Sequence, residues 1–242
     1  MTVLAALQKA SIRLVGRKPQ TFFGASPSQQ FELEMCDLVN EVAQDIAQYQ
    51  DWQELIRLNT IAGDGTATEF DLPEDYSRFP IKAAVQDYTN WAWGYYHYTD
   101  LDTFLFDEAS DFNALPGGWI IYGNVMRFSP VPGEGDQARF PYITKNIVRS
   151  FSTATKEEFT ADDDSFLLPE RLLTLGVVWR WRENKKLDAS GDQEAFIKAL
   201  DEYASKSGGP VVIRRNSRRH IPGTHPAWPW ELGQGANYWP VG

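Results

Sequence analysis

The sequence has very few of the residues that bind metals or act as nucleophiles. Its 242 residues include one cysteine, Cys36, and three histidines, His97, His220 and His225. A lone cysteine excludes a disulfide within the chain, and its place on an apolar helical face favours a buried structural thiol over a nucleophile. No carboxylate or cysteine lies at metal-ligand spacing from His220 or His225. We therefore expect no metal, no cofactor and no enzymatic activity.

Long apolar runs and a basic charge balance are also missing. The longest apolar run, around Leu172 to Trp179, is too short to cross a bilayer. The first ten residues have neither the basic leading segment nor the small-residue cleavage site of a secretory signal. The formal net charge of −10 argues against a general nucleic-acid binder, because attraction to phosphates needs a basic surface. We expect no membrane partner and assembly in the cytosol.

The clearest positive pattern is a helical hairpin over residues 165–207. Pro169 suits the first turn of a helix, and Glu170 suits the positive end of the helix dipole. Residues 188–191 read as the turn between the helices, and residues 208–210 (Gly-Gly-Pro) as the stop. The two apolar stripes are Leu172, Leu175, Val178, Trp179 and Arg182, and then Phe196, Ala199, Leu200 and Tyr203. Neither helix can bury its stripe alone, so earlier elements must complete the core.

Two more amphipathic helices are predicted near the N-terminus. One covers residues 2–15 and ends at Gly16. The other has Ser26 as its N-cap and Pro27 at its first position. Its apolar stripe is Phe31, Met35, Leu38, Val42, Ile46 and Tyr49. Four stripes predict an α+β fold in which residues 1–52 and 151–207 form a helical bundle around an inserted antiparallel β-domain, residues 53–150.

The middle of the chain changes to a strand-like period. Two strands around the turn at residues 63–65, the second ended by Pro73, predict a β-hairpin. Residues 80–88 suggest a further strand, and residues 99–102 a cap that opens a short helix through Phe106. From Gly117 three runs, split at residues 123–124 and 130–136, predict a β-meander. Residues 151–164 are polar and acidic, and we interpret them as a linker back to the bundle.

Residues 208–242 predict an extended arm that binds a partner. Repeated prolines favour extended backbone, yet the segment carries more aromatic rings than a solvated tail does. Its arginines form the dense basic cluster of an acidic chain, so the partner surface is acidic or is nucleic acid. The Trp and Pro neighbours favour a protein, and this protein's own acidic copies would serve. The predicted partner-binding residues are Arg214, Arg215, Arg218, Arg219, Trp228, Trp230, Tyr238 and Trp239.

Three features resemble a family of tailed-phage head-to-tail adaptor (connector) proteins. Residues 122–132 (YGNVMRFSPVP), followed by Gly135-Asp136 and Tyr142, resemble the central hairpin of that family. Residues 166–170 (FLLPE) and 175–181 (LGVVWRW) resemble its returning helix. The order of elements over roughly residues 1–207 is the third feature.

The resemblance implies a structural protein of the virion neck, assembled in the host cytoplasm. It implies a ring, commonly of twelve copies, that lies beneath the portal protein, joins the capsid to downstream tail proteins and lines the channel through which DNA passes without sequence-specific binding. The arm would dock on the portal. A ring also suits the sequence itself, since an extended arm with rigid aromatic anchors makes many contacts without a core of its own.

Two alternatives remain open at this point. A tail-completion or tail-tube protein differs only in where it lies in the particle. A carbohydrate-binding or glycoside-cleaving tail component would pair carboxylates beside sugar-stacking aromatic rings. Its candidate residues are Asp100, Asp102, Asp107, Glu108 and Asp111 with Trp91, Trp93, Tyr95, Tyr96 and Tyr98. We prefer to interpret them as a solvated acidic helix beside a hydrophobic interface.

Overall fold

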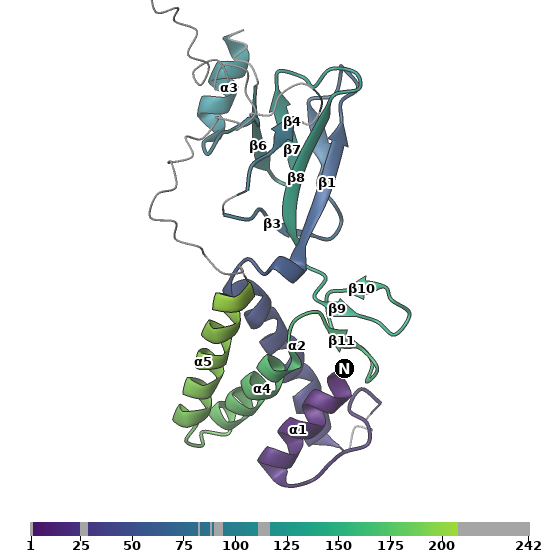
Figure 1. Ribbon diagram of the computed structural model, residues 1–242, viewed down its shortest axis with the longest axis vertical. Helices are drawn as coiled ribbons and strands as arrows, with labels where there is room; N and C mark the ends of the chain where they lie inside the picture. The colour runs from purple at the N-terminus through teal and green to yellow at the C-terminus, as the bar shows by residue number, and fades with distance from the viewer. Residues whose placement is uncertain are drawn as a thin grey trace, which may run out of the picture. The chain divides into compact units, whose positions relative to one another are not determined.

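A computed structural model describes residues 2–24, 29–81, 83–87, 89, 94–110 and 117–207. Over these residues the protein is a mixed α+β structure with five α-helices and several antiparallel sheets (Figure 1), which confirms the predicted class. The predicted helix cap at Ser26 and Pro27 and the whole arm, residues 208–242, lie outside the described residues. All eight predicted partner-binding residues belong to that arm.

Four helices share one hydrophobic core with the loop that follows β8. They are α1 (Val3–Val15), α2 (Gln30–Tyr49), α4 (Glu170–Asn184) and α5 (Ser190–Ser207). As predicted, α1 ends at Gly16, whose φ of 72° favours glycine. Helix α2 begins at Gln30, after its N-cap residue Gln29. The predicted spacing of apolar residues on α2 is correct up to Ile46, but Tyr49, at the end of the helix, is exposed.

Helix α4 lies at the centre of this core. A single apolar stripe was predicted for it, but residues 172–174 and 176–178 are all buried, because α4 contacts α1, α2 and α5 on different sides. Gly176 allows the closest approach. A Cβ atom there would lie 2.5 Å from Cγ1 of Val42 and 3.0 Å from the ring of Phe196. On α5 the predicted positions Phe196, Ala199 and Leu200 are buried.

Two four-stranded sheets surround a second hydrophobic core. In the first, β8 (Gln137–Thr144) pairs with β1 (Ile56–Ala62), β3 (Tyr76–Arg78) and β4 (Gln86–Asp87), all antiparallel; a short 3-10 turn, η1 (Gln53–Leu55), precedes β1. The second sheet has the order β2 (Glu69–Asp71), β7 (Val125–Ser129), β6 (Gly118–Tyr122) and β5 (Tyr96–His97), of which only β5 and β6 are parallel. Between them lie Trp119, Met126, Phe128 and Phe140, all buried.

Apart from the strand predicted over residues 80–88, the predicted strands exist, but two of the predicted pairings are wrong. The turn at residues 63–65 does not close a hairpin, because β1 pairs with β8 and β2 pairs with β7. The β6–β7 hairpin is confirmed, whereas β8, the third strand of the predicted meander, belongs to the other sheet. Both errors occur where the chain crosses between the sheets. There the Gly63 N–H donates to the Asp136 carbonyl at 2.8 Å, and the Gly65 N–H to the Pro132 carbonyl at 3.1 Å.

Two smaller predictions in this region have different outcomes. Among the described residues of the strand predicted over residues 80–88, only Gln86–Asp87 form a strand. The short helix is confirmed as α3 (Leu101–Ala109), and it runs three residues beyond the predicted end at Phe106. Asp100 caps it as predicted, since its carboxylate accepts a hydrogen bond from the Thr103 N–H at 3.0 Å.

Candidate interaction site

The segment predicted as an acidic linker is folded. Residues 148–166 contain three short strands, β9 (Val148–Arg149), β10 (Thr155–Lys156) and β11 (Ser165–Phe166), in the sheet order β10-β9-β11. We call residues 148–166 the hairpin segment. The linker prediction was wrong because composition counts acidic residues as solvated, whereas two of these acids accept hydrogen bonds from the backbone inside the protein.

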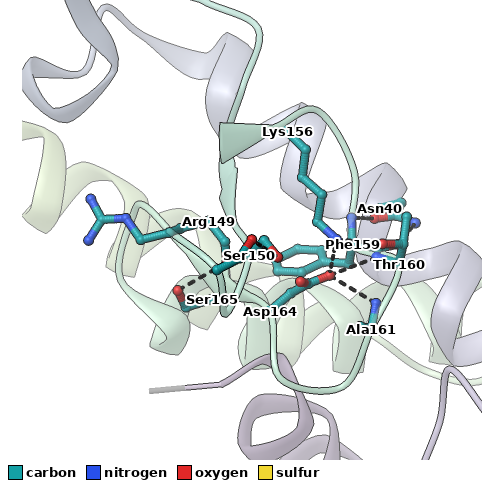
Figure 2. Close-up of polar contacts among 10 residues, drawn as sticks. Asn40, Arg149, Ser150, Lys156, Phe159, Thr160, Ala161, Asp164 and Ser165 are labelled. Atoms are coloured by element: carbon teal, nitrogen blue, oxygen red, sulfur yellow. Dashed lines mark hydrogen bonds and ion pairs between the residues drawn. The ribbon is translucent and has the colours of Figure 1, made fainter. Parts of the chain in front are cut away.

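The buried carboxylate of Asp164 holds the hairpin segment together. The residue is 1% exposed, and its Oδ2 lies 2.6 Å from Nζ of Lys156. The same oxygen accepts hydrogen bonds from the N–H groups of Thr160 at 2.8 Å and Ala161 at 2.9 Å, and Figure 2 shows these contacts converging on it. Burial acts to raise the pKa of Asp164, but the contacts with Lys156, Thr160 and Ala161 outweigh it and lower the pKa below its ordinary value.

The side chain of Asn40 on α2 holds the same segment to the helical core. Its Oδ1 accepts a hydrogen bond from the Phe159 N–H at 2.8 Å, and its Nδ2 donates to the Phe159 carbonyl at 3.3 Å (Figure 2). The Phe159 ring is 2% exposed and lies 6.0 Å from the ring of Phe166. Both backbone groups of Phe159 are therefore satisfied although the residue is buried.

The hairpin segment also completes the start of α1. Thr2, the N-cap residue, makes no side-chain cap. The Val3 N–H donates to the Asp164 carbonyl at 2.7 Å, and the Leu4 N–H to the Asp162 carbonyl at 3.3 Å. The segment also accepts a hydrogen bond from the loop that follows α1, since Oδ1 of Asp162 accepts from the Phe22 N–H at 3.1 Å. The helix terminus and the segment thus satisfy each other's backbone groups.

The turn of the hairpin segment, residues 150–154, is its exposed tip. The Ser150 N–H donates to the Ala154 carbonyl at 2.8 Å, and the Thr153 N–H to the Ser150 carbonyl at 3.0 Å, so residues 150–154 form a tight turn. Phe151 in this turn is 88% exposed. Glu157 and Glu158, which follow β10, are exposed as well. Phe151 therefore lies on the surface, outside the hydrophobic cores of the described residues.

Cys36 does not have the environment of a nucleophile. Burial, followed by the nearby charges of Asp162 and Glu32, raises its pKa to about 11. The thiolate is therefore scarce at neutral pH, in keeping with the structural role predicted for this residue.

Three of the five carboxylates of the alternative glycosidase site, Asp100, Asp107 and Glu108, have structural partners, whereas Asp102 is exposed. Asp100 caps α3 through Thr103. Asp107 accepts a hydrogen bond from the Tyr98 hydroxyl at 2.8 Å, and Glu108 pairs with Nη2 of Arg127 at 2.8 Å. Burial, and then the bond to Asp107, raises the pKa of Tyr98 to about 12.

Of the remaining candidate residues, Trp91, Trp93 and Asp111 lie outside the described residues. Tyr95 belongs to the second hydrophobic core, and Tyr96 is exposed. The contacts of Asp100, Asp107 and Glu108 thus account for these acids without a sugar.

The described residues contain no group of three or more His, Cys, Asp or Glu side chains that can hold a metal ion. Among the described helices, none is both long enough and apolar enough to span a bilayer. The exposed side chains of the hairpin segment include one apolar ring, Phe151, and the carboxylates of Glu157 and Glu158.

The structure thus brings together residues that sequence reasoning missed. None of the predicted partner-binding residues lies in the hairpin segment, because they all belong to residues 208–242. The sequence contains a weak signal for this segment, since Phe151 is an isolated aromatic residue in a polar run, SFSTATKEE. Composition alone gives no reason to expect such a residue to be held in place.

These features define a mixed α+β protein with a folded hairpin segment that exposes Phe151 at its turn. The family model described as SU10 adaptor protein matches residues 1–220. The chain belongs to this family of phage head-to-tail adaptors, which confirms the resemblance seen in the sequence and makes the protein a structural phage component. A search of curated proteins gives no match. The matched residues include Arg214 to Arg219 and end before Trp228.

Proposed function

We propose that the protein forms a ring beneath the portal, joins the capsid to the tail and lines the channel through which DNA leaves the particle. The observation that carries this proposal is the family match over residues 1–220, which covers all described residues. The ring commonly has twelve copies in the family that the sequence resembles. Its place is the virion neck, after assembly in the host cytoplasm.

The parts of the chain have the bounds predicted from the sequence. Residues 1–52 and 151–207 supply the helical part, and residues 53–150 supply the inserted β-domain. Two separate hydrophobic cores, one among the helices and one between the sheets, support this division. With a net charge of −10, the channel wall repels phosphates, so DNA passes without being held.

The arm, residues 208–242, is the part that binds the portal or a neighbouring copy. Trp228, Trp230, Tyr238 and Trp239 serve as apolar anchors, since aromatic residues bury much area and lose little rotamer freedom. Arg214, Arg215, Arg218 and Arg219 pair with acidic groups on the partner. Because the family match ends at residue 220, the arginines belong to the matched part and the tryptophans do not.

The experiment is truncation of the chain after Ser207. The shortened protein should keep the circular dichroism spectrum of the folded chain but fail to join heads to tails in an extract that lacks the adaptor. Electron micrographs of the particles provide the readout. Heads joined to tails as efficiently by the truncated protein as by the full chain would contradict the role of the arm. Full-length protein that leaves heads and tails separate would contradict the proposed function itself.

A further inference from the structure

Strand β1 forms one edge of the first sheet (Figure 1). Among the described residues it pairs with β8 alone, from Ile56 to Ala62 and without a shift in register. The second side of the strand therefore has no partner strand in the described part of the chain. Such an edge presents a row of N–H and C=O groups to which another strand can bond.

The register of β1 shows which backbone groups face the open side. The Gly63 N–H donates to the Asp136 carbonyl at 2.8 Å, which continues the β1–β8 ladder beyond the last residue of the strand. Hydrogen bonding alternates along an antiparallel pair, so every second residue of β1 directs its N–H and C=O toward β8. The residues between them direct these groups to the open side, and they include Leu58, Thr60 and Ala62.

Two residues of β8 agree with this assignment. Pro141, opposite Leu58, has no N–H to donate to β1. Gln137, opposite Ala62, donates its N–H to Oγ1 of Thr89 at 2.9 Å instead. Both are the contacts expected when Leu58 and Ala62 bond away from β8. We call residues 58–62 the open edge.

The open edge lacks the features that usually keep other strands away. Exposed edges are normally short, charged, interrupted by proline or bent by bulges. The other edge strands of the described sheets have two or three residues each, whereas β1 has seven. The open edge, LNTIA, contains no charge and no proline, and Leu58 is 68% exposed. It is therefore suited to bind an additional strand.

The arm contains a segment that suits this edge. Residues 211–213, Val-Val-Ile, are the only run of three consecutive Val or Ile residues in the chain, and β-branched residues are enriched in strands. Pro210 precedes them, and proline is tolerated as the first residue of a strand. We call residues 211–213 the VVI run. Each copy thus carries one open edge and one VVI run, two different surfaces that can join identical copies head to tail.

The charges beyond the end of β1 suit the arginines that follow the VVI run, Arg214-Arg215. The turn after β1 exposes Asp64, and the neighbouring loop exposes Glu134. These two segments are joined, because the Gly135 N–H donates to the Gly63 carbonyl at 3.1 Å. The nearby cation Arg139 belongs to β8, one strand further from the edge. A strand added parallel to β1 brings both arginines to this acidic end.

The start of β1 offers less to the two arginines. Its carboxylate, Glu54, already accepts hydrogen bonds from the hydroxyl groups of Tyr203 and Ser207. Arg57 lies at the same end, where its Nη1 donates to the carbonyl of Ile56 at 2.9 Å. An added strand that ran antiparallel to β1 would bring like charges together there, so charge favours the parallel direction.

We infer that the VVI run of one copy adds a strand, parallel to β1, to the open edge of a second copy, with Arg214 and Arg215 facing Asp64 and Glu134. Main-chain hydrogen bonds to the open edge then hold the two copies together. The inference rests on the proposed function, in which the arm binds the portal or a neighbouring copy, and it names the neighbouring copy and the surface that receives the arm.

Substitutions at the open edge test the inference on the full chain. Leu58→Lys adds a charge to the edge, and Thr60→Pro removes an N–H that points away from β8. Each should weaken self-association about tenfold or more, as measured by native mass spectrometry and sedimentation velocity. Ile81→Lys is the matched control, because Ile81 is also exposed, at 90%, and lies outside β1. Circular dichroism checks the fold, and if Thr60→Pro does not fold, Leu58→Lys still decides.

Substitutions in the arm test the other side of the contact. Val212→Pro/Ile213→Pro removes two consecutive backbone donors, one from each alternating set, and should weaken self-association as strongly as Leu58→Lys. Asn216→Pro/Ser217→Pro, outside the VVI run, is the matched control and should have no effect. Reversal of both arginines, Arg214→Glu/Arg215→Glu, should also weaken association. Adding Glu134→Lys to that variant should restore part of the loss, because an attractive pair is rebuilt with its signs exchanged.

Cross-linking in a mixture identifies which chain supplies the added strand. With Cys36→Ser as background, one protein carries Thr60→Cys and a second, made larger by a tag, carries Val212→Cys. A short bis-maleimide should give covalent dimers that contain one copy of each protein. Neither protein can form this product within a single chain, so mixed dimers show that the arm of one copy reaches the open edge of another.

Other products of the same experiment overturn the inference. Dimers of the Thr60→Cys protein alone assign the open edge to a second β1. Cross-links in a chain with both cysteines, but none in the mixture, assign the added strand to the same chain. If mixed dimers are absent and the protein still joins heads to tails, the proposed function stands and the arm binds the portal. If the full chain forms neither rings nor mixed dimers and leaves heads and tails separate, both proposals fail.

Discussion

The Nζ of Lys156 lies 2.6 Å from Oδ2 of Asp164, a residue that is 1% exposed. Two backbone N–H groups, those of Thr160 and Ala161, donate to the same oxygen. This convergence turns an acidic stretch of chain into an ordered support for the exposed Phe151. We therefore expect loss of the contact to lower both the stability of the protein and the order of the hairpin segment.

Removal of the Asp164 carboxylate should destabilise the protein. Asp164→Ala leaves Lys156 and two N–H groups without their common acceptor, so we expect a loss of about 3 kcal/mol in the free energy of unfolding. Asp164→Asn keeps an acceptor for the N–H groups and should cost less, about 1–2 kcal/mol. Urea denaturation measures both. Asp163→Asn is the control, because Asp163 is exposed and its change should stay within about 0.5 kcal/mol. Equal losses at positions 163 and 164 would refute this account of the buried carboxylate.

Asp164 should also make the protein sensitive to acid. Its pKa in the folded state is below the ordinary value of 3.8, so the unfolded chain binds a proton first as the pH falls. The contribution of this group is fully present well above pH 3.8 and is lost as the pH drops from there through the lower folded pKa. We expect a smaller acid-induced loss of stability in Asp164→Asn than in the natural chain, as measured by urea denaturation between pH 6 and pH 3. Asp163→Asn should follow the natural chain, and identical curves for all three proteins would be the contrary result.

Asn40 should control the order of the hairpin segment. Asn40→Ala leaves the buried N–H and carbonyl of Phe159 without their partner, which costs about 1–3 kcal/mol. Amide hydrogen exchange in residues 150–165 should become faster than in the natural chain. Asn40→Asp retains the acceptor for the Phe159 N–H and should have an intermediate effect. Unchanged exchange in this segment after Asn40→Ala would show that the contacts of Asp164 suffice to hold it.

Gly176 should tolerate no side chain, although it lies within a helix. Alanine is normally favoured over glycine in a helix by about 1 kcal/mol. A Cβ atom at position 176 would approach Val42 to 2.5 Å, so Gly176→Ala should instead destabilise the protein by about 1–3 kcal/mol. Gly191→Ala on α5 is the matched control, because no atom lies within 4 Å of a Cβ there. It should leave the stability unchanged or raise it by up to about 1 kcal/mol. Thermal and urea denaturation of both variants give the comparison, and a stabilised Gly176→Ala would contradict the close packing of α2 on α4.

The sequence by itself determined the elements whose signal is local. Buried positions such as Met35, Val42 and Ile46 recur with the helical period, and a period can be read without knowing what covers it. Gly16 and Asp100 marked helix ends for the same reason, since caps act on the nearest turn of backbone. The family resemblance drew on short local motifs, residues 122–132, 166–170 and 175–181, and on the order of elements. By contrast, the burial of α4 depends on helices that are distant in the sequence. A single stripe was therefore predicted for a helix that is buried on several sides.

Only the tertiary structure decided which strands pair and which acids are buried. The partner of β1 is β8, some eighty residues away, and the Gly63 turn has the same sequence whether it closes a hairpin or crosses between sheets. Nothing in the run Asp162-Asp163-Asp164 distinguishes the buried carboxylate from the exposed one. The physical reason is the same for both. Period and capping depend on neighbours in the chain, whereas pairing and burial depend on neighbours in space, and the fold brings those together.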